Sequence, residues 1–201
     1  MKLIIASNNQ GKIKEVKKIL EPLGYEVLSQ REVGIELEVE ETGITYEENA
    51  ILKAEALYNI TKTAVLSDDS GLSIDYFDGA PGLYSARFKP ELSSKDTNEY
   101  VLNEMKDVKD ENRTAYFVCC LCYINDNGEK TIVEAKCNGK IAYEQKGNNG
   151  FGYDPIFYLD EYGKTMAEIP EEEKNKISHR AKALQMLKKN YHKYYILGVI
   201  K

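Results

Sequence analysis

The stretch VLSDDSGLSID, from Val65 to Asp75, places two adjacent aspartates, Asp68 and Asp69, directly after a short apolar run. Turns rich in Asp, Ser and Gly are common without any function. Two neighbouring carboxylates at the end of a buried strand are harder to explain, because like charges held together cost free energy unless a cation or water offsets them. Magnesium prefers hard oxygen ligands and commonly couples one or two carboxylates to substrate phosphates. The pattern therefore favours a Mg²⁺ site.

A second acidic pair, Glu40 and Glu41 in VEETG, could add another ligand to such a site. The simpler interpretation of this pair is a solvated acidic turn, because charge runs are usually exposed. In the helical pattern that follows, Asn49 and Lys53 are four residues apart and therefore share one helix face. We include Lys53 among the candidate substrate-binding residues.

The segment SNNQGK, from Ser7 to Lys12, lies between an apolar run and a helical pattern. A turn that caps a helix would explain it without any ligand. However, Lys12 falls at a helix start, where the dipole disfavours a cation and the free amides favour an anion, so a bound phosphate would explain both features. The segment is not a Walker loop, because Ile13 stands where that motif requires Ser or Thr.

Two later segments complete the candidates. In GNNGFGYD, glycines flank Phe151, and they would either let a ligand lie against the ring or simply form a turn around a buried aromatic. In KNKISHR, the residues Lys174, His179 and Arg180 form either part of a ligand pocket or a solvated basic turn. His192 is expected at the surface. Carboxylates for a metal, cations for phosphates and an aromatic ring for a base together describe a nucleotide site.

The whole composition narrows the class of protein. The 201 residues fit one domain with two lobes, and a net charge of −6 argues against a general nucleic-acid-binding surface. The sequence has no apolar stretch of 18 residues, so we expect neither export nor a membrane span. The cysteines of CCLC and Cys137 lack zinc-ligand spacing, and we expect them as reduced thiols in a cytoplasmic protein.

Hydrophobic periodicity predicts the elements that position these residues. Strands and helices alternate first and a hairpin follows, which predicts an α/β fold with a mixed sheet and helices packed on it. In the first half, the expected elements are a strand at 2–6, a helix through Ile13 and Leu20 that Gly24 ends, a helix from the Thr45 capping box to Tyr58, and a strand at 63–67. In the second half, they are a helix at 93–105, a hairpin through Asn127-Gly128, a short strand after the glycine-rich segment and one closing helix over 171–190.

The sequence resembles the inosine/xanthosine triphosphate pyrophosphatase family, whose members hydrolyse deaminated purine nucleoside triphosphates. Six motifs carry the resemblance in order over residues 3 to about 188: ASNNQGKIKEV, EETGITYEENAILKA, SDDSGL, GAPGLYSARF, NGFGYDP and EEKNKISHRAKAL. Any one of them is a modest signal, whereas six in order are highly specific. The sequence departs from the family pattern at Asn148 and Asn149, where a further glycine is common.

The resemblance implies a single two-lobed α/β domain over residues 1–201, with a long mixed β-sheet flanked by helices, a central substrate cleft and a homodimeric state. It also implies Mg²⁺-dependent hydrolysis of ITP, dITP and XTP to the monophosphate and pyrophosphate, with no nucleic-acid or membrane partner. The resemblance assigns phosphate binding to Ser7, Asn8, Asn9, Gln10, Gly11 and Lys12. It assigns metal binding to Glu41 and Asp69, activation of water to Asp69 and substrate contact to Ser70. It assigns binding of the base and sugar to Phe151, Gly152, Tyr153 and Asp154, and it completes the pocket with Lys174, His179 and Arg180. Asp68 is the neighbour of Asp69 in the same motif.

Two other functions stay open on the residues alone. A nucleotide-sensing module would bind through the same groups without turnover, and a hydrolase that attacks the terminal phosphate would release phosphate in place of pyrophosphate. For base selectivity, we expect Phe151 to stack on the ring and the His179-Arg180 segment to donate to its 6-oxo group. Adenine presents an amino donor at that position, so it would leave a charged donor unmatched.

Overall fold

The computed structural model describes the backbone of residues 1–196 and the side chains of residues 1–190. The side chain of His192 and the tail from residue 191 therefore lie outside the described side chains. The chain divides into two compact units. Unit 1 comprises Met1–Asp69, Cys119–Ala135 and His179–Lys201, and unit 2 comprises Ser70–Val118 and Lys136–Ser178.

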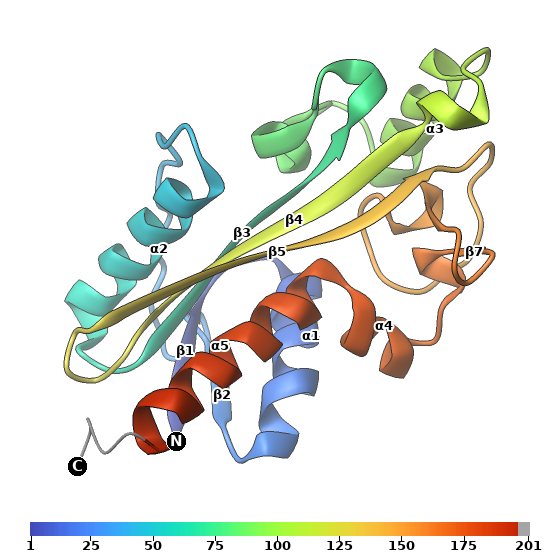
Figure 1. Cartoon of the computed structure of the whole chain (residues 1–201). Coiled ribbons are helices and arrows are strands. Elements are labelled where there is room, and N and C mark those ends of the chain that lie inside the picture. The colour runs from blue at the N-terminus through green and yellow to red at the C-terminus, as the bar shows by residue number, and fades with distance from the viewer. Residues whose placement is uncertain (197–201) are drawn as a thin grey trace. The chain divides into compact units, whose positions relative to one another are not determined.

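The described residues form a seven-stranded mixed sheet with helices packed on it, in the strand order β2-β1-β3-β4-β5-β6-β7 (Figure 1). Strand β1 pairs in parallel with β2 and β3, whereas β6 pairs antiparallel with β5 and β7. The predicted α/β class is confirmed. The strands are β1 Lys2–Ala6, β2 Glu26–Ser29, β3 Val65–Ile74, β4 Thr114–Ile124, β5 Lys130–Ile141, β6 Phe157–Leu159 and β7 Lys164–Thr165, and the helices are α1 Gln10–Leu20, α2 Tyr46–Thr61, α3 Ser94–Glu104, α4 Glu171–Ile177 and α5 His179–Ile196.

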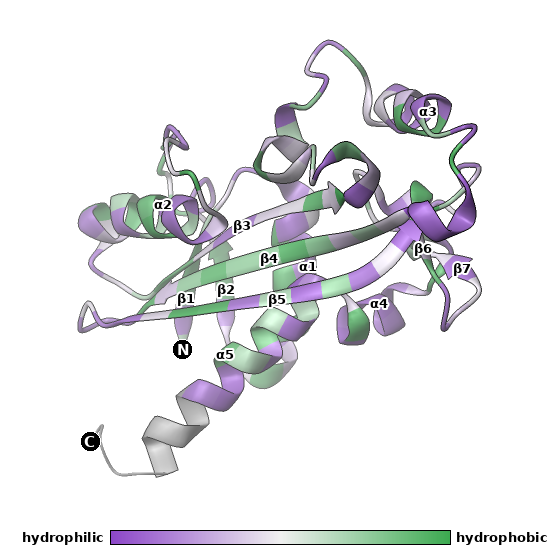
Figure 2. Ribbon diagram, turned by 45° about the horizontal axis from the view of Figure 1, so that its top comes forward, coloured by the Kyte–Doolittle hydropathy of each residue, from purple (hydrophilic) through white to green (hydrophobic). Residues whose placement is uncertain are grey.

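Unit 1 has an apolar core on each face of its part of the sheet. Side chains alternate along a strand, so Leu3 and Ile5 of β1 join the core made with α1 and α5, whereas Ile4 joins the core made with α2. The same alternation in β4 sends Cys119 and Cys120 to opposite cores. The four cysteines are buried and are not joined in disulfides. Figure 2 shows apolar colour over much of β4, as expected for a strand that is buried on both faces along most of its length.

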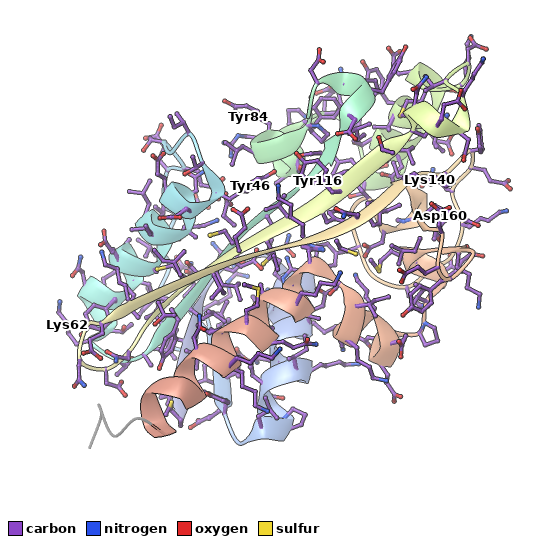
Figure 3. The ribbon with its side chains drawn as sticks, viewed as in Figure 1. Tyr46, Lys62, Tyr84, Tyr116, Lys140 and Asp160 are labelled. Atoms are coloured by element: carbon purple, nitrogen blue, oxygen red, sulfur yellow. The ribbon has the colours of Figure 1, made fainter. Side chains whose placement is uncertain are left out.

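Unit 2 has its own core, which gathers residues from β6, α3 and the ends of the long strands. The rings of Phe117 and Phe157 pack there with centroids 4.5 Å apart. At the surface, the Lys140 ammonium lies 2.7 Å from a carboxylate oxygen of Asp160, and Figure 3 shows the two side chains directed toward one another. None of the described helices combines the length and apolar character needed to cross a membrane.

Three predicted boundaries need correction. Strand β3 does not end before the aspartates but continues through them to Ile74. The closing helix is two helices, because Ser178 has extended backbone dihedrals (φ −65°, ψ 160°) that are typical of an N-cap residue, and α5 begins directly after it. Helix α1 ends at Leu20, and a 3₁₀ turn lies between it and the left-handed Gly24.

Candidate functional site

Strand β3 directs its two adjacent aspartates to opposite faces of the sheet. Asp68 contacts Lys12 of α1 and Arg180 of α5, whereas Asp69 contacts Lys53 of α2. This follows from the alternation of side chains along a strand. The adjacent aspartates suggested, from sequence, one shared Mg²⁺ site. Instead, each carboxylate has its own cations, which explains how a buried strand tolerates both charges.

Asp68 is fully surrounded by donors. Its Oδ2 accepts from Arg180 Nε at 2.6 Å and from the Cys119 thiol at 3.2 Å, and its Oδ1 lies 2.7 Å from Lys12 Nζ. Burial alone would raise the pKa of Asp68, but the charges of Arg180 and Lys12 outweigh that effect and hold the pKa well below its usual range. Asp68 is therefore an ionised anchor for two cations, and its oxygens are committed to them.

Arg180 is held from a second side by Glu15. The guanidinium is 1% exposed, and its Nη1 donates to Glu15 Oε2 at 2.5 Å while its Nε donates to Asp68. Burial alone would lower the pKa of Arg180, but the charges of Asp68 and Glu15 raise it well above its usual value. The two carboxylates together hold this guanidinium inside the buried group. His179, the first residue of α5, is also buried.

Asp69 forms a second polar group with Lys53 and Glu41. Lys53 Nζ lies 2.7 Å from Glu41 Oε1 and 2.8 Å from Asp69 Oδ1, so the two carboxylates converge on one cation position. The other carboxylate oxygen, Asp69 Oδ2, is buried and has no hydrogen-bond partner in the described structure. Burial raises the pKa of Asp69 above its ordinary value, although the Lys53 charge opposes the shift.

The segment before α1 is built as a helix cap. Asn9 is the N-cap, and its side chain accepts from the Lys12 backbone amide at 3.1 Å, while Ser7 Oγ accepts from the Asn9 amide. Asn8 Oδ1 accepts from Gln30 Nε2, which fixes the loop to the segment after β2. The predicted phosphate loop is therefore partly helical, because Gln10, Gly11 and Lys12 already belong to α1. The first turn of a helix leaves backbone amides available to an anion.

Within unit 2, the structure brings together Phe151, Asp154 and Lys174. Asp154 Oδ2 accepts from Lys174 Nζ at 2.5 Å and from the Phe151 backbone amide at 2.8 Å, and the Lys174 ammonium lies 5.1 Å from the Phe151 ring centroid. Gly150 has φ +74°, and a Cβ there would lie 2.0 Å from Asp154 Oδ2. Only glycine fits this turn, which holds the ring beside the buried ion pair.

The neighbouring predicted residues fix the same turn. The Gly152 carbonyl accepts from Asn98 Nδ2 at 3.0 Å, and the Tyr153 hydroxyl donates to the Ser85 carbonyl at 2.9 Å. Burial raises the pKa of Tyr153 to about 12, so this hydroxyl stays protonated. Ser70, predicted to contact substrate, is half-buried on β3.

Similarity to known proteins shows the family of this chain. The sequence profile of the Ham1 family matches residues 3–190. The chain belongs to the Ham1 family. A Bacillus subtilis (strain 168) protein named dITP/XTP pyrophosphatase is 52% identical to it over 187 residues, which cover 92% of this chain and 94% of that protein. A Clostridium perfringens (strain 13 / Type A) protein of the same name is 47% identical over 196 residues, which cover 94% of this chain and 96% of that protein.

Solved structures of Ham1 proteins have the same fold. The structure of the Staphylococcus aureus Ham1 protein matches with a TM-score of 0.82 and 40% identity, covering 96% of this chain and 98% of that chain. A HAM1 protein from Coxiella burnetii matches with a TM-score of 0.84 and 36% identity, covering 96% of this chain and 99% of that chain. The fold and the family are therefore shown over nearly the whole length.

Two residues that shape the site, Glu15 and Asn98, were not among the candidates, and a third, Asn149, was noted only as a departure from the family pattern. Glu15 holds Arg180, Asn98 holds the Gly152 carbonyl, and Asn149 donates from Nδ2 to the Ile169 carbonyl at 3.1 Å. Asn149 is one of the two residues that depart from the family pattern, and here it fixes the loop in place of a glycine. No local signal in the sequence marked Glu15, because a glutamate in a helical pattern is usually exposed.

Proposed function

We propose that this protein hydrolyses the non-canonical purine nucleoside triphosphates ITP, dITP and XTP to the nucleoside monophosphate and pyrophosphate. The observation that carries the proposal is the buried Asp69 carboxylate, with one oxygen held by Lys53 and the other without a hydrogen-bond partner in the described structure. Similarity over nearly the full length to proteins named dITP/XTP pyrophosphatase supports the substrate class.

Asp69 is the group that we assign to the activation of water. Desolvation raises its pKa, which makes the carboxylate a stronger base than an exposed aspartate. Without metal, Lys53 holds Oδ1 and Oδ2 has no hydrogen-bond partner in the described structure, so we assign the proton from water to Oδ2. Water attack at the α-phosphorus forms one P–O bond, breaks the bond to the β-phosphate bridge and transfers the water proton to Asp69. No covalent intermediate is needed.

Glu41 and Asp69 also have the chemistry that Mg²⁺ requires. Both offer carboxylate oxygens, both direct one oxygen to a common cation position, and Asp69 has a buried oxygen without a partner in the described structure. No group of three or more His, Cys, Asp or Glu side chains suited to a metal exists among the described residues. Two carboxylates nonetheless suffice, because Mg²⁺ usually takes its other ligands from water and substrate phosphates. When bound, the metal would neutralise phosphate charge and lower the pKa of water.

The remaining predicted residues divide into two roles. We assign the triphosphate to the cap Ser7–Asn9, the first turn of α1 and Lys12, because helix-start amides and a lysine complement phosphate charge. We assign the purine to Phe151 and Lys174, which lie together in unit 2. Donation by Arg180 to the 6-oxo group stays a prediction, and the carboxylate bonds of Arg180 favour a role in holding Asp68.

The expected assembly and location are proposals of the same kind. A homodimer follows from the family resemblance, and light scattering on the purified protein tests it. The four buried cysteines, which are not joined in disulfides, support a reducing compartment such as the cytoplasm.

Product analysis tests the function. The protein is incubated with ITP, dITP, XTP, ATP and GTP in the presence of Mg²⁺, and both products are identified. We expect inosine or xanthosine monophosphate and pyrophosphate, with ATP and GTP much slower. Binding without turnover would support the sensing module, and release of phosphate would support attack at the terminal phosphate.

A further inference from the structure

The Lys53 ammonium has its full complement of acceptors. Its Nζ lies 2.7 Å from Glu41 Oε1, 2.8 Å from Asp69 Oδ1 and 2.9 Å from the Asp68 carbonyl oxygen. An ammonium group has three N–H donors, so these three acceptors use all of them. The side chain is 14% exposed. Lys53 is therefore built into the carboxylate pair and is not a solvated surface lysine.

The acceptors are fixed by elements that do not depend on a ligand. Asn49, one helical turn before Lys53 on α2, accepts from the Gly43 backbone amide at 2.8 Å and so ties the loop that follows Glu41 to the helix. A Cβ at Gly43 would lie 2.6 Å from Glu48 Cβ, so the loop packs tightly on α2. Asp69 is carried by β3, whose neighbour β1 pairs with it in parallel. The cation position is thus preformed by a loop, a helix and a strand.

The position occupied by the ammonium is also where the two carboxylates would share a divalent cation. Asp69 Oδ2 is buried in a residue that is only 6% exposed, and it has no hydrogen-bond partner in the described structure. A metal that took Glu41 and Asp69 as ligands would meet the Lys53 charge at contact distance, and like charges at that distance repel strongly inside a protein.

We propose that Lys53 occupies the cation position of Glu41 and Asp69 in the metal-free protein, and that Mg²⁺ and the Lys53 ion pairs are mutually exclusive. This inference rests on the magnesium site proposed above. The lysine keeps the two carboxylates in position when no metal is bound. Metal binding frees the ammonium from both, which makes its charge available to the substrate's phosphates and couples metal binding to substrate binding.

Calorimetric titration of Mg²⁺ into the metal-free protein tests the proposal through affinity and not through activity. The variants are Lys53→Met and, as a matched control, Lys130→Met, which also removes one lysine paired with a carboxylate, here Glu55, on an exposed surface. We expect Lys53→Met to bind Mg²⁺ at least about tenfold more tightly than the wild type, because a competing charge has been removed. The Mg²⁺ affinity of Lys130→Met should stay within about twofold of that of the wild type, because solvent and salt screen exposed charges.

The outcomes separate the two proposals. If the wild type and Lys53→Met both fail to bind Mg²⁺, the magnesium site itself is wrong. If the wild type binds and Lys53→Met binds equally or more weakly, the magnesium site stands and the competition by Lys53 is overturned.

A second measurement uses the wild type alone, in case Lys53→Met does not fold. Crystals grown without metal and with Mn²⁺ are compared. We expect the Lys53 ammonium to leave hydrogen-bonding distance of both Glu41 and Asp69 when Mn²⁺ is bound to them. An ammonium that keeps both bonds beside the bound metal would overturn the proposal.

Discussion

Arg180 Nε lies 2.6 Å from Asp68 Oδ2, and each of the two side chains is 1% exposed. The two residues are 112 positions apart in the sequence, on α5 and β3. Glu15 and Lys12 of α1 complete the group with a second carboxylate and a second cation. Both Asp68 oxygens are taken by donors, so we propose that Asp68 holds the cations and that Asp69 is the carboxylate that acts in the chemistry.

Asp68→Asn should destabilise the protein strongly. The substitution removes the anion between two buried or half-buried cations, and breaking a buried ion pair by deleting one partner typically costs about 3–5 kcal/mol. Urea unfolding followed by circular dichroism measures the change. Glu55→Gln, which breaks an exposed pair with Lys130, is the control and should not differ measurably from the wild type. A loss for Asp68→Asn no larger than that of the control would show that the buried group does not hold the fold.

The same carboxylate predicts a pH dependence of stability. The folded-state pKa of Asp68 is lowered well below its usual range, since the Arg180 and Lys12 charges outweigh burial. A group whose pKa is lower in the folded state stabilises the protein above the unfolded pKa, which is about 3.9 for aspartate, and loses that contribution as the pH falls. The urea midpoint of the wild type should therefore fall as the pH drops below about 5, and that of Asp68→Asn should fall less steeply. If the urea midpoints of the wild type and Asp68→Asn fell equally steeply with pH, Asp68 would not be the source of the pH dependence.

Lys12→Ala should weaken both triphosphate binding and stability. The helix dipole alone predicts almost no cost to the fold, because a cation at a helix start is unfavourable. The structure revises this, since Lys12 Nζ lies 2.7 Å from buried Asp68. Losing one donor to a buried charged acceptor costs about 1–3 kcal/mol or more. The expected kinetic result is a raised KM for ITP, measured on the folded fraction. Wild-type KM together with wild-type stability would remove Lys12 from both roles.

Asp69→Asn should abolish turnover while leaving substrate binding detectable. An amide cannot act as a base, and loss of general base catalysis typically lowers the rate by ~10²–10⁴. Single-turnover kinetics with ITP measure the chemical step, and calorimetry with a non-hydrolysable analogue measures binding. A variant with a kcat near that of the wild type would show that another group activates water.

Much of the fold was readable because local signals agreed with the tertiary structure. The apolar run of 2–6 became β1, and the Thr45 cap accepts from the Glu48 amide at 3.1 Å, at the start of α2 as its spacing predicted. The periodicity of α1 placed Ile13 and Val16 in the core. In these segments, the caps and the hydrophobic periodicity predict the same secondary structure, and the tertiary contacts are consistent with it.

The segment around Asp68 and Asp69 was predicted to end the strand, because its local composition is that of a turn. Asp, Ser and Gly favour turns when considered alone. In the protein, the charges on Lys12, Lys53 and Arg180 offset both carboxylates, so the strand continues through them. Those lysines and the arginine come from three helices, and no local window contains the pairing. The break at Ser178 was missed for a related reason, since helical periodicity continues on both sides of a single extended residue.

Hydrolysis of ITP in ¹⁸O-labelled water tests the central claim most directly, because the label records which phosphorus the water attacks. The reaction is run with the wild-type protein and Mg²⁺ and is stopped before the substrate is exhausted. The products are then analysed by mass spectrometry. Attack at the α-phosphorus predicts one ¹⁸O in inosine monophosphate and none in pyrophosphate. Label in pyrophosphate, or labelled phosphate as a product, would contradict the account.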